Sequence, residues 1–202
     1  MDLIFQIAIL IMSVVAHEVA HGYSARMLGD QTAEYEGRLT LNPLKHLDPF
    51  GSFILPLISY QLGGFLLGWA KPVPYNPYNL RPGRFSEALV ALAGPAVNLA
   101  IAIFFGLILR LSALVSFSQP FLEIVASIVV INIVLAVFNM VPVPPLDGSK
   151  ILFAFLPQSM LHLRDTLEQY GFALLLLFIF FLWQYLLPIV FLIFWLITGY
   201  GI

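Results

Sequence analysis

The sequence predicts an all-α integral membrane bundle with about four to six transmembrane helices. Of its 202 residues, 60% are hydrophobic and only 10% are charged, whereas a soluble domain carries roughly 25% charged residues. Several apolar runs approach the length of about 20 residues that a helix needs to cross a lipid bilayer. The length suits one polytopic domain over residues 1–202, and no basic patch indicates nucleic-acid binding.

The first predicted span covers residues 3–27 and ends in a polar motif. No basic segment precedes its apolar run and no clear small-residue cleavage site follows it, so we expect a retained span rather than a signal peptide. Residues 17–21 read H-E-x-x-H. Positions i and i+4 lie on one face of a helix, so His17 and His21 can direct both imidazoles toward one ion.

The chemistry of this motif indicates a zinc site. Zn²⁺ favours nitrogen and oxygen ligands in a tetrahedral site, and a catalytic zinc keeps one position open for water. Glu18 can reach such a water and accept its proton. The sequence has no cysteine, so a further ligand must be His, Asp or Glu. A chance match to a short pattern is the alternative, but ionisable groups in an apolar run are expensive in lipid and indicate function.

The segment that follows is mixed in character. Residues 29–48 are polar, and residues 35–41 and 68–75 have the composition of short strands; prolines confine the second to a sheet edge. Between them, residues 50–67 are apolar but contain three glycines and a proline. Eighteen residues extend about 27 Å as a helix, slightly less than the ~30 Å hydrocarbon core. We therefore expect a re-entrant segment, and a complete crossing is the alternative.

Three further spans are predicted. Residues 88–109 are rich in alanine and glycine, which permit close approach of helices. Residues 121–141 form an apolar run that ends at a proline-rich segment. Residues 171–198 form a long apolar run interrupted by a Gln-Tyr pair and a proline. One kinked span is predicted there, and a tight helical hairpin is the alternative.

Basic residues indicate the orientation of the spans. They follow the first span, precede the span at 88–109 and follow the span at 121–141, whereas residues 111–120 carry no charge. Lys and Arg favour the cytoplasmic side, and all three basic segments share that side if residues 50–67 are re-entrant. We therefore expect a multi-pass protein of the cell's cytoplasmic membrane, with the H-E-x-x-H motif toward the cytoplasm.

Asp147 is the best candidate for a third metal ligand. It lies just after the span at 121–141, behind three prolines and before Gly148, so it reaches the same side as His21 if residues 50–67 are re-entrant. An aspartate before glycine is also a common turn residue. The competing candidates are polar loop residues: Asp30, Asp48, Glu87 and His46.

Two long motifs together resemble the site-2 protease family of intramembrane zinc metalloproteases, peptidase family M50. The first is H-E-x-x-H at residues 17–21, and the second is N-x-x-P-x-P-x-L-D-G at residues 139–148. Residues 93–98 (AGPAVN) resemble the family's middle core helix. Residues 38–43 and 68–73 resemble a short sheet, or re-entrant element, beside the active site.

The resemblance covers residues 13–152 and implies the metal ligands and the catalytic base. His17, His21 and Asp147 would bind one Zn²⁺ per chain, with water as the fourth ligand. Glu18 would be the general base and then the acid that protonates the leaving amine. The chain resembles a minimal, core-only member without a PDZ or CBS domain.

The resemblance also implies contacts with a substrate. Asn139 and Asn98 would lie near the substrate or its transition state, and interhelical hydrogen bonds are their alternative roles. The substrate would be a membrane protein whose single-span helix unwinds within the lipid bilayer before it is cut. An open sheet edge would offer its extended backbone hydrogen bonds. A regulatory membrane partner is a further expectation.

Two other classes of function compete with proteolysis. One is a catalytically inactive zinc-binding membrane protein or transporter, against which Glu18 argues, because pure metal binding needs no base there. The other is a structural membrane protein, against which the clustered His, Glu and Asp argue. Metal content and cleavage of a single-span peptide distinguish the three classes.

Overall fold

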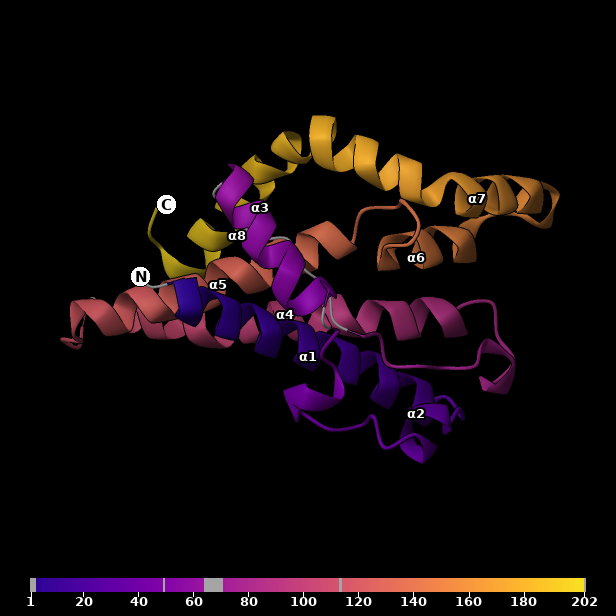
Figure 1. Ribbon diagram of the computed structural model, residues 1–202, viewed down its shortest axis with the longest axis horizontal. Coiled ribbons are helices and arrows are strands. Elements are labelled where there is room, and N and C mark those ends of the chain that lie inside the picture. The colour runs from indigo at the N-terminus through magenta and orange to yellow at the C-terminus, as the bar shows by residue number, and fades with distance from the viewer. Residues whose placement is uncertain (1–2, 49, 64–70, 113, 202) are drawn as a thin grey trace.

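The computed structural model of the chain describes residues 3–48, 50–63, 71–112 and 114–201, which form a helical bundle (Figure 1). Three long helices make up its centre: α1 (Leu3–Met27), α4 (Ser86–Leu111) and α5 (Gln119–Asn139). The shorter helices are α2 (Thr32–Tyr35), α3 (Leu55–Gly63), α6 (Asp147–Phe155), α7 (Leu161–Leu177) and α8 (Leu187–Thr198). α4 is the central element, because it packs against α1, α5, α6 and α8.

Irregular helical turns join these elements. Short 3₁₀ turns occur at Pro43–Lys45, Pro77–Asn79, Gln158–Met160 and Trp183–Leu186, and π-helical stretches occur at Phe50–Ile54 and Phe178–Leu182. α5 has Pro120 in its first turn, where the missing N–H would have no helical partner anyway. α8 ends at Thr198 and is capped by Gly199, whose φ of +80° is the left-handed conformation that suits glycine.

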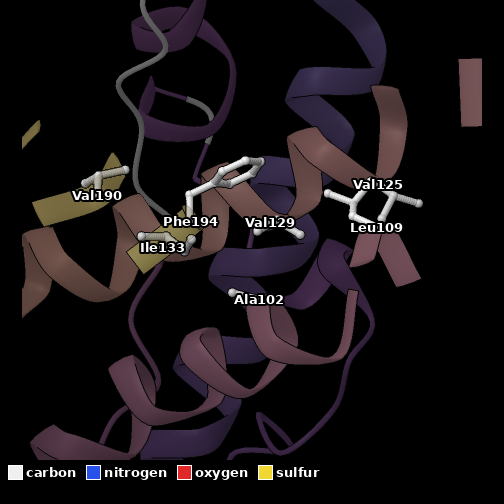
Figure 2. Close-up of a cluster of buried hydrophobic side chains, with 7 residues drawn as sticks. All are labelled: Ala102, Leu109, Val125, Val129, Ile133, Val190 and Phe194. Carbon is white, nitrogen blue, oxygen red and sulfur yellow. The ribbon is translucent and has the colours of Figure 1, made fainter. Parts of the chain in front are cut away.

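The apolar core lies between α4, α5 and α8 (Figure 2). Its buried members are Ala102, Leu109, Val125, Val129, Ile133, Val190 and Phe194. Many of the large apolar side chains outside this core are exposed, as expected for helices that face lipid rather than water.

Within the described ranges, four helical stretches are long and apolar enough to cross a membrane: Leu3–Met27, Ser86–Leu111, Gln119–Asn139 and His162–Thr198. Each covers or overlaps a predicted span, and the all-α membrane bundle is confirmed. The last stretch is one continuous run of 37 residues, and Figure 1 shows that it bends between α7 and α8.

The strand predicted at residues 35–41 is wrong. The N–H of Gly37 donates to Glu34 O and the N–H of Arg38 donates to Ala33 O, with Gly37 in the left-handed region at φ +61°. These bonds close the end of α2, so the amides that a strand would have used are already paired.

The second predicted strand, at residues 68–75, is also not formed in the described part of the chain. Residues 68–70 lie outside the described residues, and residues 71–75 are irregular. Two of these positions are prolines, which have no N–H. The N–H of Lys71 donates to His46 O and the N–H of Val73 donates to the Glu18 side chain, so neither is paired with a strand. The described residues therefore contain no sheet edge that could bind a substrate.

The apolar segment predicted at residues 50–67 is helical over residues 50–63, and residues 64–67 lie outside the described residues. Its helical part extends at most about 21 Å, less than the ~30 Å of a hydrocarbon core. The chain on either side of this excursion meets again, because the N–H of Lys71 donates to His46 O at 2.8 Å.

One end of the bundle gathers the polar elements. The C-terminal end of α1, the N-terminal end of α4 and the C-terminal end of α5 lie together, near α2 and α6 (right in Figure 1). Both chain termini lie toward the opposite end. The residues singled out by the two motifs are therefore brought to the same end.

Candidate metal centre

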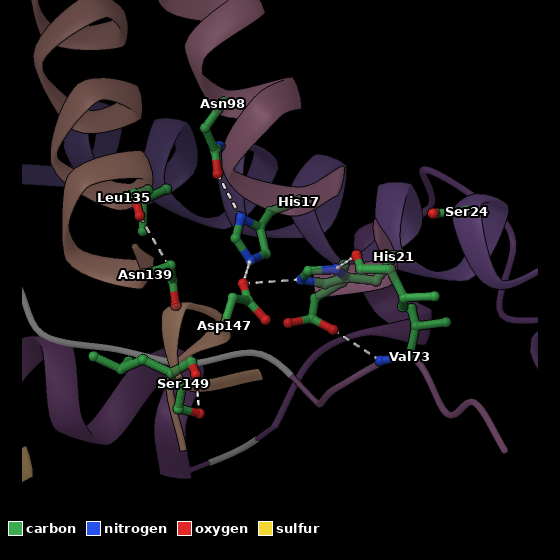
Figure 3. Close-up of polar contacts among 12 residues, drawn as sticks. His17, His21, Ser24, Val73, Asn98, Leu135, Asn139, Asp147 and Ser149 are labelled. Carbon is green, nitrogen blue, oxygen red and sulfur yellow. Dashed lines mark hydrogen bonds and ion pairs between the residues drawn. The ribbon is translucent and has the colours of Figure 1, made fainter. Parts of the chain in front are cut away.

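Three ionisable side chains from two helices meet at the polar end of α1. His17 and His21 lie one turn apart on α1, and Asp147 begins α6. Asp147 Oδ2 is 3.1 Å from His17 Nε2 and 3.2 Å from His21 Nε2. All three residues are buried, and Figure 3 shows both imidazoles facing the carboxylate. Among the described residues, this is the one cluster of three side chains able to hold a metal ion.

Hydrogen bonds behind the histidines fix their tautomers. His21 Nδ1 lies 2.7 Å from Val90 O, and because a backbone carbonyl only accepts, Nδ1 carries the proton. His17 Nδ1 lies 2.5 Å from Asn98 Oδ1, which also accepts. In the neutral rings both Nε2 atoms therefore present lone pairs to Asp147. Three electron pairs that converge at a buried point require a cation, and two imidazoles with a carboxylate suit Zn²⁺.

A close contact between α6 and the end of α5 brings the carboxylate to the histidines. A Cβ at Gly148 would lie 2.3 Å from Met140 O and 2.5 Å from Val141 O, so no larger residue fits without a backbone shift. Asp147 occupies the first turn of α6, where the positive end of the helix dipole favours a carboxylate. The Asp-Gly pair thus has a packing reason as well as a chemical one.

One face of α4 forms the wall of the site. Val90, Gly94 and Asn98 are four residues apart, so they lie on the same face of the helix. A Cβ at Gly94 would lie 2.5 Å from both His17 Nε2 and His21 Nε2. This face therefore supplies one hydrogen-bond acceptor for each imidazole ring. Because Gly94 has no side chain, α4 does not crowd the two Nε2 atoms.

The carboxylate of Glu18 is held by the irregular segment at residues 71–75. The N–H of Val73 donates to Glu18 Oε2 at 2.9 Å (Figure 3), and within the described residues the other oxygen accepts no hydrogen bond. Arg38 fixes the segment, because its Nη2 donates to Lys71 O at 3.0 Å and to Pro72 O at 3.3 Å. One oxygen of Glu18 is thus anchored, and the other is available to a water beside the cluster.

Comparison with known proteins agrees with this geometry. The model of peptidase family M50 matches residues 5–123 and 111–182. The chain belongs to peptidase family M50. It is 40% identical over 173 residues to a Bacillus subtilis protein named "Putative zinc metalloprotease YwhC", and the match covers 83% of this chain and 76% of that protein.

Other relatives of this M50 chain carry the same kind of name. A Mycolicibacterium smegmatis protein named "Putative zinc metalloprotease Rip2" is 33% identical over 168 residues, which are 81% of this chain and 62% of that relative, so the chain spans less than two thirds of it. A Methanocaldococcus jannaschii protein named "Putative zinc metalloprotease MJ0611" is 31% identical over 160 residues, 73% of this chain and 72% of that relative. No solved structure matches the chain. The M50 chain is therefore a site-2-type zinc metalloprotease and a multi-pass membrane protein.

Asp30, a competing candidate for the third metal ligand of this M50 protease, forms hydrogen bonds in another part of the structure. Its carboxylate accepts hydrogen bonds from Thr32, Asn76 and Asn79. Burial raises the pKa of Asp30, but these hydrogen bonds outweigh burial and hold the pKa below its ordinary value. Asp30 thus ties the loop after α1 to the loop before α4.

The other three competitors also lie in contacts of their own. His46 is fully buried, and its Nε2–H donates to Thr40 O at 2.8 Å. Asp48 accepts from the N–H of Gly51, and Glu87 pairs with Arg164 at 3.7 Å. Within the described residues, none of them joins the cluster of His17, His21 and Asp147.

The two predicted substrate contacts have different surroundings. Asn98 is fully buried; its oxygen accepts from His17, and its Nδ2 donates to Ser13 O and Asn132 Oδ1. Both of its amide hydrogens are therefore used within the protein. Asn139 is half-buried at the end of α5, and its Nδ2 donates to Leu135 O at 3.0 Å. Among the described residues, the other amide hydrogen of Asn139 has no acceptor.

Sequence reasoning singled out Asn98 but not its bond to His17, and it missed Val90 and Asn132. Val90 acts through its backbone carbonyl, which leaves no signal in the sequence. Asn132 did leave one, because a polar side chain in the middle of an apolar span is rare and marks a functional candidate.

We expect Gly94→Ala to abolish stoichiometric zinc binding, because the added methyl would stand 2.5 Å from both Nε2 atoms. Metal content of the purified protein measures this, and circular dichroism checks the fold. Ala96→Val, which adds volume to an exposed position of the same helix, should keep its zinc. A Gly94→Ala chain with full zinc occupancy would contradict the close approach of α4 to the two rings.

Proposed function

We propose that this protein is an intramembrane endopeptidase that hydrolyses peptide bonds within or near the transmembrane segments of membrane proteins. The observation that carries the proposal is the position of the buried cluster on α1, a helix long and apolar enough to cross a membrane. Ligands on a spanning helix meet substrates that are themselves in the bilayer. A peptide chain must lose its helical hydrogen bonds before its carbonyls become accessible, so the substrate helix would unwind there.

Each motif residue would have one role in hydrolysis. His17, His21 and Asp147 would hold the zinc. Zn²⁺ held there supplies Lewis acidity toward water and the scissile carbonyl. Glu18 would accept a proton through the oxygen that Val73 leaves free, and then protonate the leaving amine. The remaining amide hydrogen of Asn139 would donate to the substrate carbonyl as negative charge develops on it.

We propose that the site lies toward the cytoplasmic side of the cell membrane. The ends of α1, α4 and α5 that meet at the metal centre are the ends beside the basic loops, and only Arg110 among the lysines and arginines lies near the opposite end of α4. Basic residues favour the cytoplasmic side. The contact between Lys71 and His46 supports a re-entrant course for the segment between them.

We expect Glu18→Gln to keep its zinc and to lose at least about a hundredfold in peptide hydrolysis, the range for removing a general base. Cleavage of a model single-span substrate in proteoliposomes, together with metal content, measures both effects. Zinc binding without cleavage in the unmodified chain would favour the inactive or transporter alternative. Near-normal turnover of Glu18→Gln with zinc bound would remove Glu18 from the mechanism.

We expect Asp147→Ala to lower zinc content and activity together, because two imidazoles alone leave the ion one protein ligand short. Asp48→Ala removes a carboxylate from a loop outside the cluster and should keep both. The reverse result, with zinc lost in Asp48→Ala and kept in Asp147→Ala, would show that the third ligand is misassigned.

We expect single cysteines at positions 45 and 71 to react with membrane-impermeant reagents from the same, cytoplasmic face, because His46 and Lys71 are hydrogen-bonded neighbours. The chain has no native cysteine, so each label reports one site. A cysteine at position 115, exposed in the loop between α4 and α5, should react from the other face. Labels at 45 and 71 on opposite faces would exclude the re-entrant course.

A further inference from the structure

We propose that Asn132 is a positioning residue for the metal centre, because it holds the Asn98 amide in the orientation that fixes the zinc-binding tautomer of His17. The proposal rests on the ligand role of His17 proposed above. Asn132 lies on α5, Asn98 on α4 and His17 on α1, so three helices contribute one side chain each. Both asparagines are fully buried.

The hydrogen bonds form one connected chain. Asn132 Nδ2 donates to Ile128 O and to Ser13 Oγ, each at 2.9 Å. Asn132 Oδ1 accepts from Asn98 Nδ2 at 2.8 Å. Asn98 Oδ1 then accepts from His17 Nδ1 at 2.5 Å. Every polar atom of the two amides has a partner.

The direction of this chain is set by a backbone carbonyl at its far end. An amide has one accepting and one donating side, and its orientation follows from partners that play a single role. Ile128 O only accepts, so the nitrogen of Asn132 must face it and the oxygen of Asn132 must face Asn98. The nitrogen of Asn98 then faces Asn132, and its oxygen is left for His17.

The consequence for His17 is a defined tautomer. With the Asn98 oxygen against Nδ1, the ring proton stays on Nδ1 and the Nε2 lone pair faces the zinc position. If the Asn98 amide turned over, its N–H₂ would face Nδ1 and favour the proton on Nε2, where it blocks the ligand atom. Ser13 O also accepts from Asn98 Nδ2, but at 3.2 Å, so the shorter bond to Asn132 is the stronger constraint.

The first test is zinc affinity of the apo protein in detergent, measured by competition with a chelator. Removing an outer partner of a ligating histidine typically lowers metal affinity by about 10- to 100-fold, so Asn98→Ala should fall in that range. Asn132→Leu acts one hydrogen bond further from the histidine, so it should lower zinc affinity measurably but by less than Asn98→Ala does. Thr198→Val removes a buried hydroxyl whose hydrogen bonds, among the described residues, stay within the C-terminal part of the chain. This variant should bind zinc like the unmodified protein.

A double-mutant cycle and a spectrum distinguish positioning from general packing. In the Asn98→Ala background, Asn132→Leu should have no further effect on zinc affinity, because its route to His17 is already gone. Nitrogen-15 spectra of the apo protein, which has four histidines, should show His17 with its proton on Nδ1 in the unmodified chain and a mixture of tautomers in Asn132→Leu.

Each result has one meaning. An unchanged His17 tautomer and unchanged zinc affinity in Asn132→Leu, or additive losses in the cycle, would overturn the proposal. Absence of zinc binding in the unmodified chain would overturn the ligand assignment instead, while the tautomer spectrum would still decide the role of Asn132. If Asn132→Leu does not fold, Ser13→Ala, which removes one acceptor from Asn132, should shift the tautomer in the same direction by a smaller amount.

Discussion

The structure depends on one electrostatic constraint, the meeting of three unshared electron pairs in a buried place. Two imidazole nitrogens and an oxygen of Asp147 converge between the helices, where a low dielectric makes their repulsion strong. Only a cation turns this repulsion into attraction, so metal binding and the packing of this end of the bundle are coupled. The same constraint requires an acceptor behind each ring. α4 supplies Val90 O and Asn98 Oδ1 for that purpose, and Gly94 between them keeps the helix close without filling the site.

The features that the sequence predicted well are those set by spacing along one element or by composition. The span at residues 3–27 coincides with α1, because an uninterrupted apolar run of that length has one structural solution in lipid. The pairing of His17 and His21 follows from helical periodicity alone. Asp147 could be predicted because prolines follow α5, and the two spans α4 and α5 together return the chain to the end where α1 finishes. The family match and the zinc metalloprotease names of its members agree with these local arguments.

The features that the sequence could not predict depend on which groups meet across helices. The strand predicted at residues 68–75 does not form over its described part, residues 71–75, because the amides of Lys71 and Val73 donate to His46 O and to the carboxylate of Glu18. Neither partner can be predicted from a strand-like composition. Val90 contributes a backbone oxygen, which any residue could supply. Asn132 is visible as a polar residue in an apolar run, but its partners depend on the register between α4 and α5. Local patterns therefore pointed to the three candidate ligands, and tertiary packing alone showed which groups orient their side chains.

The buried amides are better explained by orientation than by stability. An interhelical hydrogen bond within a membrane contributes only ~0.6 kcal/mol on average, because the separated helices also find partners for their polar groups. A tenfold change in zinc affinity corresponds to about 1.4 kcal/mol. This free energy is larger than the contribution of a single such hydrogen bond. Asn98 and Asn132 could be replaced by apolar residues at little expense in helix association, yet no apolar residue can accept the Nδ1 proton of His17. The need for a hydrogen-bond acceptor behind the His17 ring therefore explains why an amide lies at the centre of three apolar helices. Its contribution to bundle stability is secondary.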